Sequence, residues 1–133
     1  MMRLARHIPL ERGDATSTAK SLEASSERLD SKVSVMIFPE GTRSKTGDLR
    51  EFKSGAFRLA IEHQVPILTL AVYCTRDSLR KHDWRLGNAE AEVRVLDPVP
   101  TEGLTMDDMP ALRTQVRDII IAARDDLRRE FGD

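Results

Sequence analysis

Residues 40 to 43 carry four side-chain types that together suit a phosphate group. They are a carboxylate, a glycine, a hydroxyl and a guanidinium, at Glu40, Gly41, Thr42 and Arg43. The planar fork of Arg43 matches phosphate oxygens, and Gly41 lets the backbone approach a ligand closely. Because these residues follow an apolar run at 33–38, the pattern predicts a phosphate-binding loop at the end of a buried strand.

The residues after this loop add positive charge. Between positions 43 and 58 there are five cations and two acids, in a chain whose formal net charge is -1. This local excess favours a phosphate-bearing substrate, while the near-neutral total argues against a general nucleic-acid binder. The tail from 97 to 133 carries nine acids and five arginines, a mixture typical of a solvated helix face. The cations of the first stretch are Arg43, Lys45, Arg50, Lys53 and Arg58.

The composition is that of one soluble globular domain. The chain has 133 residues, of which 40% are hydrophobic and 32% charged. The single cysteine, Cys74, excludes an intrachain disulfide, and its place at the end of an apolar run predicts an inert buried thiol. No apolar run reaches the ~20 residues of a membrane span. Since His, Cys and carboxylates show no metal-ligand spacing, we expect no metal site.

Strands that alternate with helices must position the phosphate-binding loop. Apolar runs predict strands at 4–10, 33–38, 65–73 and 91–96, the last with an alternating pattern. Helices are predicted at 14–29, capped by Asp14 or Thr16, and at 54–63, with Phe57, Ala60 and Ile61 facing the core. His63 is expected to cap the second of these helices at its C-terminus. The segments 44–49 and 75–88 are predicted loops.

The last predicted element is a long amphipathic helix. Thr105 and Asp108 form a capping-box pattern in which Asp replaces the usual Glu. The whole pattern predicts an α/β domain with a mixed sheet flanked by helices. The apolar stripe of the helix consists of Met109, Leu112, Val116, Ile119, Ile120, Ala123 and Leu127.

Four blocks in order resemble the glycerolipid acyltransferases, which include the 1-acylglycerol-3-phosphate acyltransferases. The block Phe-Pro-Glu-Gly-Thr-Arg-Ser at 38–44 is similar to the Glu-Gly-Thr-Arg block of that family, and residues 7–14, 52–57 and 65–72 resemble its neighbouring blocks. The resemblance implies that Arg12, Arg43 and Lys53 hold the glycerol phosphate. It also implies that Gly41 and Thr42 lie close to it, and that Glu40 orients the arginines or the substrate.

The first block of that family is not found in these 133 residues. It is an Asn-His in which four residues separate the histidine from an Asp, and the histidine is the general base. Here His7, His63 and His82 are each followed five positions later by a residue other than Asp. A positioned base is typically worth ~10²–10⁴-fold in rate. We therefore expect an incomplete domain, the C-terminal portion of the acyltransferase, in which residues 1–133 form one unit that is nearly inactive alone.

The resemblance implies acyl transfer from acyl-coenzyme A or acyl carrier protein to a lysophosphatidate, giving phosphatidic acid. It implies no metal or redox cofactor, no nucleic acid, and work at the cytoplasmic face of a membrane. Two alternatives stay open. One is a non-catalytic lipid-phosphate-binding protein or partner of a full-length enzyme, and the other is a related acyltransferase with a different phosphorylated acceptor.

Overall fold

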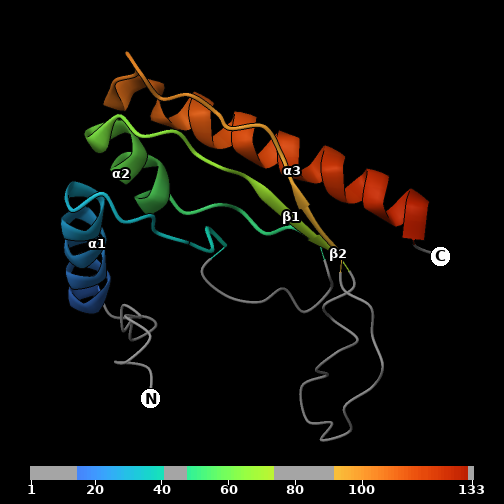
Figure 1. Cartoon of the computed structure of the whole chain (residues 1–133), viewed down its shortest axis with the longest axis horizontal. Helices are drawn as coiled ribbons and strands as arrows, with labels where there is room; N and C mark the ends of the chain where they lie inside the picture. Colours follow the sequence, from blue (N-terminus) through green and yellow to red (C-terminus); the bar gives the residue numbers. More distant parts are fainter. Residues whose placement is uncertain (1–14, 41–47, 74–91, 132–133) are drawn as a thin grey trace, which may run out of the picture.

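The computed structural model of the chain describes residues 15–40, 48–73 and 92–131. Helix α1 packs on α2, α2 on α3, and α3 on strand β1, which pairs with β2 (Figure 1). Helices combined with a sheet confirm the predicted α/β class. The elements are α1 (Ala15–Asp30), α2 (Gly55–His63), β1 (Leu70–Tyr73), β2 (Glu92–Val95), a short 3₁₀ helix η1 (Met106–Asp108) and α3 (Met109–Phe131).

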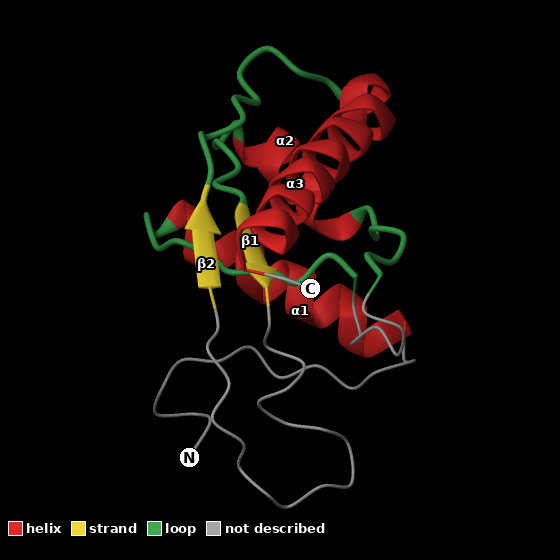
Figure 2. Ribbon diagram, turned by 90° about the vertical axis from the view of Figure 1, so that its right-hand side faces the viewer, coloured by secondary structure: helices red, strands yellow, loops and turns green. Residues whose placement is uncertain are grey.

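The two described strands form an antiparallel sheet beside α3 (Figure 2). Leu70 lies opposite Val95, and Ala71 opposite Arg94. One isolated bridge between Ile67 and Val99 extends the pairing beyond the strands. Of the predicted mixed sheet, the described part of the chain therefore contains an antiparallel pair. The predicted strand at 4–10 lies outside the described residues.

The prediction of a buried strand at 33–38 is wrong. These residues form no strand, and Met36 and Phe38 are 71% and 76% exposed. A strand is stabilised when a second strand pairs with its backbone and another layer covers its side chains. Neither partner is found for this segment among the described residues, so its apolar side chains remain in contact with solvent.

The strand predicted at 65–73 is shorter than its sequence pattern. Only Leu70–Tyr73 form β1, and Leu68 is 56% exposed. The helix predicted at 54–63 is confirmed as α2, and the one predicted at 14–29 is confirmed as α1. Because α1 begins at Ala15, Thr16 lies inside the helix and does not cap it.

Strand β2 confirms the predicted alternation, but its apolar residues point away from the helices. Val93 and Val95 are 53% and 63% exposed. Arg94, between them, reaches α3 and donates a hydrogen bond to Glu130 at 2.6 Å. The strand therefore presents its charged residue to α3 and its valines to solvent, the reverse of the usual arrangement.

The main core lies between α2, α3 and the segments that flank the sheet. Phe57, Ala60 and Ile61 are buried, as their spacing predicted. The rings of Phe52 and Phe57 stack with centroids 6.2 Å apart and an interplanar angle of 16°. The largest buried cluster consists of Phe52, Phe57, Ile61, Val99, Leu112 and Val116.

Helix α3 begins as the sequence predicts and joins the two cores of the molecule. The backbone N–H of Thr105 donates to Asp108 Oδ2 at 2.8 Å, which is the return bond of a capping box. The first half of its buried stripe packs in the main core, and the second half forms a smaller cluster with Ala71 of β1. None of the described helices has the length and apolar character needed to cross a membrane. The buried residues of the stripe are Leu112, Val116, Ala123 and Leu127.

Candidate functional site

Two of the six predicted phosphate-binding residues lie in the described parts of the chain. These are Glu40, which is half-buried, and Lys53, which is exposed. The other four, Arg12, Gly41, Thr42 and Arg43, lie outside the described residues, and their roles stay predictions. The geometry therefore bears on the two ends of the 41–47 loop, where the chain enters and leaves it.

The two ends of this loop are joined by hydrogen bonds. Glu40 Oε2 accepts the backbone N–H of Arg50 at 3.0 Å. The backbone N–H of Lys53 donates to the carbonyl oxygen of Pro39 at 2.8 Å. Because Pro39 and Glu40 precede the loop while Arg50 and Lys53 follow it, these two bonds close its base.

Glu40 thus has a structural partner that the sequence does not indicate. The prediction assigns its carboxylate to the arginines or to the substrate, whereas Oε2 binds a backbone N–H of Arg50. A carboxylate has about four acceptor positions, so this one bond leaves capacity for a further donor. The carboxylate therefore connects the two segments that flank residues 41–47 and retains acceptor positions.

The residues on both sides of Lys53 are held in place by the core and by α2. Phe52 is only 2% exposed and lies in the main core. Ser54 occupies the N-cap position of α2, and Gly55 begins the helix. A Cβ atom at Gly55 would lie 3.1 Å from Leu22 Cδ2, so glycine permits the close approach of α1 and α2. Lys53 is consequently an exposed cation on a backbone fixed from both sides.

Three side chains link α1 to α2. Ser26 Oγ lies 2.8 Å from His63 Nε2, and His63 Nδ1 lies 3.1 Å from Asp30 Oδ1. The expectation that His63 caps α2 is wrong: Gln64 is the C-cap, in the left-handed conformation with φ 50°, and His63 points to α1 instead. The link holds α1 against α2. Helix α1 begins at Ala15, three positions after Arg12, the residue predicted to bind phosphate.

The same three residue types form the catalytic triad of serine hydrolases, but the setting here does not suit catalysis. Ser26 lies within α1, where backbone N–H groups are used in helical hydrogen bonds and cannot form an oxyanion hole. The side chain of Asp30 is 71% exposed, whereas the triad carboxylate is buried. We interpret the trio as a connection between the two helices.

Helix α3 contacts the chain just after residues 41–47. Arg117 Nη2 donates to the carbonyl oxygen of Leu49 at 3.3 Å, across 68 positions of sequence. The sequence gives no signal for this contact, because Arg117 reads there as one of several charges on a solvated helix face. The segment 49–52, which follows the loop, is therefore held by Glu40, by the burial of Phe52 in the main core, and by Arg117 of α3.

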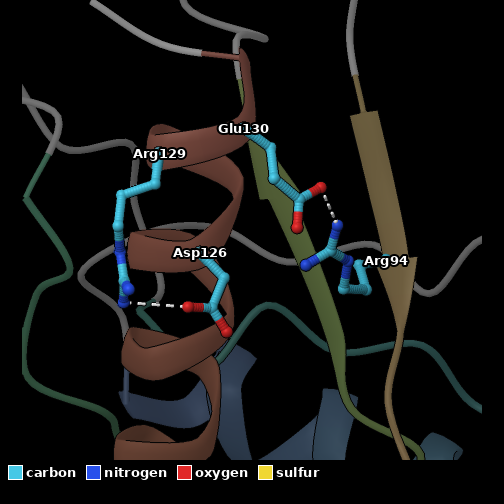
Figure 3. A network of polar contacts seen from close by, with 4 residues as sticks. All are labelled: Arg94, Asp126, Arg129 and Glu130. Carbon is cyan, nitrogen blue, oxygen red and sulfur yellow. Dashed lines mark hydrogen bonds and ion pairs between the residues drawn. The ribbon is translucent and has the colours of Figure 1, made fainter.

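Two ion pairs lie at the C-terminal part of α3. The hydrogen bond with Glu130 raises the pKa of Arg94, and neighbouring carboxylates add to the effect (Figure 3). Arg129 pairs with Asp126 within α3 at 2.9 Å. Within the described ranges, no group of three or more His, Cys, Asp or Glu side chains could hold a metal ion.

Comparisons with known proteins match this chain to acyltransferases. The family model described as Acyltransferase matches residues 1–73, more than half of the chain. Human 1-acyl-sn-glycerol-3-phosphate acyltransferase alpha is 46% identical over 105 residues, which cover 79% of this chain and 36% of the human protein. The 1-acyl-sn-glycerol-3-phosphate acyltransferase of Limnanthes douglasii is 29% identical over 119 residues, covering 89% of this chain and 42% of the plant protein.

The fold has a counterpart among solved structures. The crystal structure of the 1-acyl-sn-glycerophosphate (LPA) acyltransferase from Thermotoga maritima superposes with a TM-score of 0.74 at 25% sequence identity. The match covers 85% of this chain and 46% of that one. The chain thus spans less than half the length of each of these relatives.

Proposed function

Because this chain belongs to the acyltransferase family, we propose that it forms the phosphate-holding part of a 1-acylglycerol-3-phosphate acyltransferase. The observation that carries this proposal is the 46% identity with a human protein named for that activity. The substrate is a lysophosphatidate, and the product is phosphatidic acid. The acyl donor is a thioester of coenzyme A or of acyl carrier protein, and the complete enzyme acts at the cytoplasmic face of a membrane.

In this reaction the free hydroxyl oxygen of the lysophosphatidate attacks the thioester carbonyl carbon. The C–S bond breaks, the new ester forms, and the hydroxyl proton passes to the departing thiolate through a general base. The residues of this chain contribute by binding and orienting the acceptor. Arg43, Arg12 and Lys53 bind the phosphate, and Gly41 and Thr42 lie beside it.

The closed base of the loop supports this assignment. A phosphate site requires donors held in fixed positions, since ordering a free loop would reduce the affinity. The bonds from Arg50 to Glu40 and from Lys53 to Pro39 fix the ends of the loop before any ligand binds. Glu40 accordingly positions the loop and leaves phosphate binding to the cations.

The first experiment measures binding of a short-chain, soluble lysophosphatidate to the full chain by titration calorimetry. We expect Arg43→Ala to weaken binding by about tenfold or more, because a charge-assisted hydrogen bond is worth about 1.5–3 kcal/mol. Arg58→Ala is the matched control, since Arg58 is an exposed cation of α2 outside the predicted site, and it should change the affinity by less than about twofold. Equal affinity of Arg43→Ala and the parent chain would contradict the proposal.

A second candidate function, lipid-phosphate binding without catalysis, is favoured by one observation. The 133 residues contain no His-x-x-x-x-Asp sequence to supply the base. The discriminating measurement is release of free coenzyme A from an acyl thioester in the presence of lysophosphatidate. Binding without release supports the second candidate for the chain alone, whereas robust release supports catalysis.

A further inference from the structure

Four arginines of α3 lie on one stripe of the helix. They occupy positions i, i+4, i+11 and i+15, which bring side chains onto the same face. This stripe adjoins the buried one, since each arginine directly follows a buried residue of α3. The name arginine face refers below to Arg113, Arg117, Arg124 and Arg128.

The arginine face lines two adjoining clefts. The first has a volume of about 350 Å³ and is bounded by Arg113, Thr114 and Arg117 together with Glu51 and Phe52. Its size is at the lower end of small-molecule sites, which span roughly 300–1,000 Å³. The second has a volume of about 210 Å³, and Arg117 belongs to both. The second is lined by Asp48, Leu49, Arg117, Ile121, Arg124, Asp125 and Arg128.

The arginines of these clefts have unused hydrogen-bond capacity. Arg113 and Arg128 form no hydrogen bond or ion pair with other described residues, whereas Arg124 is engaged. Arg117 donates to the Leu49 carbonyl through Nη2, and its Nε is buried with no partner in the described structure. A guanidinium carries five N–H donors, so Arg113 and Arg128 can offer theirs to an acceptor ligand.

Charge favours an anion in both clefts. Two arginines face one carboxylate, Glu51, in the first cleft, and three arginines face two carboxylates in the second. Guanidinium groups bind phosphate oxygens in a bidentate manner, which a carboxylate-rich surface cannot do. The small excess of one positive charge in each cleft predicts an interaction that salt weakens strongly.

We propose that the arginine face binds phosphate groups of the acyl donor, a coenzyme A thioester. The inference rests on the proposed function and extends it by placing the second substrate. Lysophosphatidate has one phosphate, assigned above to the loop at 41–47, whereas two clefts that share Arg117 suit a ligand with several phosphates. Asp48, which lines the second cleft, directly follows residues 41–47 in the sequence, so the proposed donor site begins where the predicted acceptor loop ends.

The test measures binding of coenzyme A itself to the full chain by titration calorimetry at low salt. We expect the double variant Arg113→Gln/Arg117→Gln to weaken binding by about tenfold or more, and 0.5 M NaCl to weaken binding to the parent chain. The single variant Arg117→Lys keeps the charge but loses the planar fork, so it should give an intermediate loss. Circular dichroism shows whether each variant is folded. If the double variant does not fold, the affinity of Arg117→Lys for coenzyme A decides the outcome.

The matched control is Arg129→Gln on the same helix. Arg129 is 76% exposed and pairs with Asp126 (Figure 3). Neither residue lines either cleft. Its substitution removes one positive charge, where the double variant removes two, and should change the affinity for coenzyme A by less than about twofold. An equal loss in the control would show that net charge alone matters, and absence of coenzyme A binding to the parent chain would also overturn the proposal.

Two further measurements separate coenzyme A binding by the arginine face from the proposed lysophosphatidate binding on which it rests. The variant Arg43→Ala should weaken lysophosphatidate binding while leaving coenzyme A binding within about twofold, and Arg113→Gln/Arg117→Gln should do the reverse. Vesicles of phosphatidic acid and phosphatidylcholine provide the second arm. If the arginine face variants lose vesicle binding but retain coenzyme A binding, the face contacts lipid headgroups, and the assignment to the donor is wrong.

Discussion

The α2–α3 core and the segment 33–38 have similar apolar side chains but opposite environments. Phe57 of the core is 2% exposed, whereas Phe38 of the segment is 76% exposed. In the core, Phe57 packs in one cluster with Phe52 and with Leu112 of α3, which is 55 positions further along the chain. The segment has no such cover in the described structure. The difference shows that an apolar pattern specifies a face that can be buried, while burial itself requires a second surface.

The largest expected effect tests the core side of this comparison. Phe57→Ala removes a fully buried ring and its stacking with Phe52, so we expect a loss of about 3–5 kcal/mol in the free energy of unfolding. Chemical denaturation followed by circular dichroism measures it. A loss under about 1 kcal/mol would mean that the core is no better packed than the segment.

An intermediate effect is expected where α1 meets α2. His63→Ala removes both the contact with Ser26 and the pairing with Asp30, and the histidine side chain is 15% exposed. We expect a loss of about 1–2 kcal/mol in the free energy of unfolding, typical of hydrogen bonds at a partly buried site. Arg58→Ala, an exposed substitution on the same helix, should stay within about 0.5 kcal/mol. Equal losses in the two variants would remove the link from our account of how α1 is held.

The smallest effect is expected in the exposed segment. Phe38→Ala is the counterpart of Phe57→Ala, and it should change the free energy of unfolding by no more than about 0.5 kcal/mol because little area leaves contact with other residues. The same denaturation experiment measures it. A loss approaching that of Phe57→Ala would show that the segment is covered in solution and would end the contrast between the two regions.

The elements that the sequence predicted correctly depend on local interactions. The helix at 14–29 follows from a composition of Ala, Ser, Lys and Glu with few apolar residues, and the one at 54–63 follows from helical periodicity. The start of α3 follows from a capping pattern between residues three apart, Thr105 and Asp108. The core positions Phe57, Ala60 and Ile61 follow from spacing on one turn-and-a-half of helix. Such signals are contained within a few residues, so the chain alone carries them.

The features that the sequence predicted wrongly, or did not indicate, depend on partners distant in the chain. Residues 33–38 have the composition of a strand, but strand formation requires a neighbouring backbone that local sequence does not specify. The alternation of β2 predicted a strand correctly but did not indicate which face would meet α3, since Arg94 gains a partner only from Glu130. His63 likewise left its expected capping role because Ser26 and Asp30 lie within reach on α1.

The features of the predicted phosphate-binding loop also separate into those set by the sequence and those set by the tertiary structure. The sequence by itself determined the residue types at 40–43, the family to which they belong, and the absence of a His-x-x-x-x-Asp block from these 133 residues. Only the tertiary structure decided that Glu40 closes the loop through the backbone of Arg50, and that Arg117 of α3 reaches Leu49. Side-chain chemistry is fixed by each residue's identity, whereas the partner of each group is fixed by packing between segments far apart in the chain.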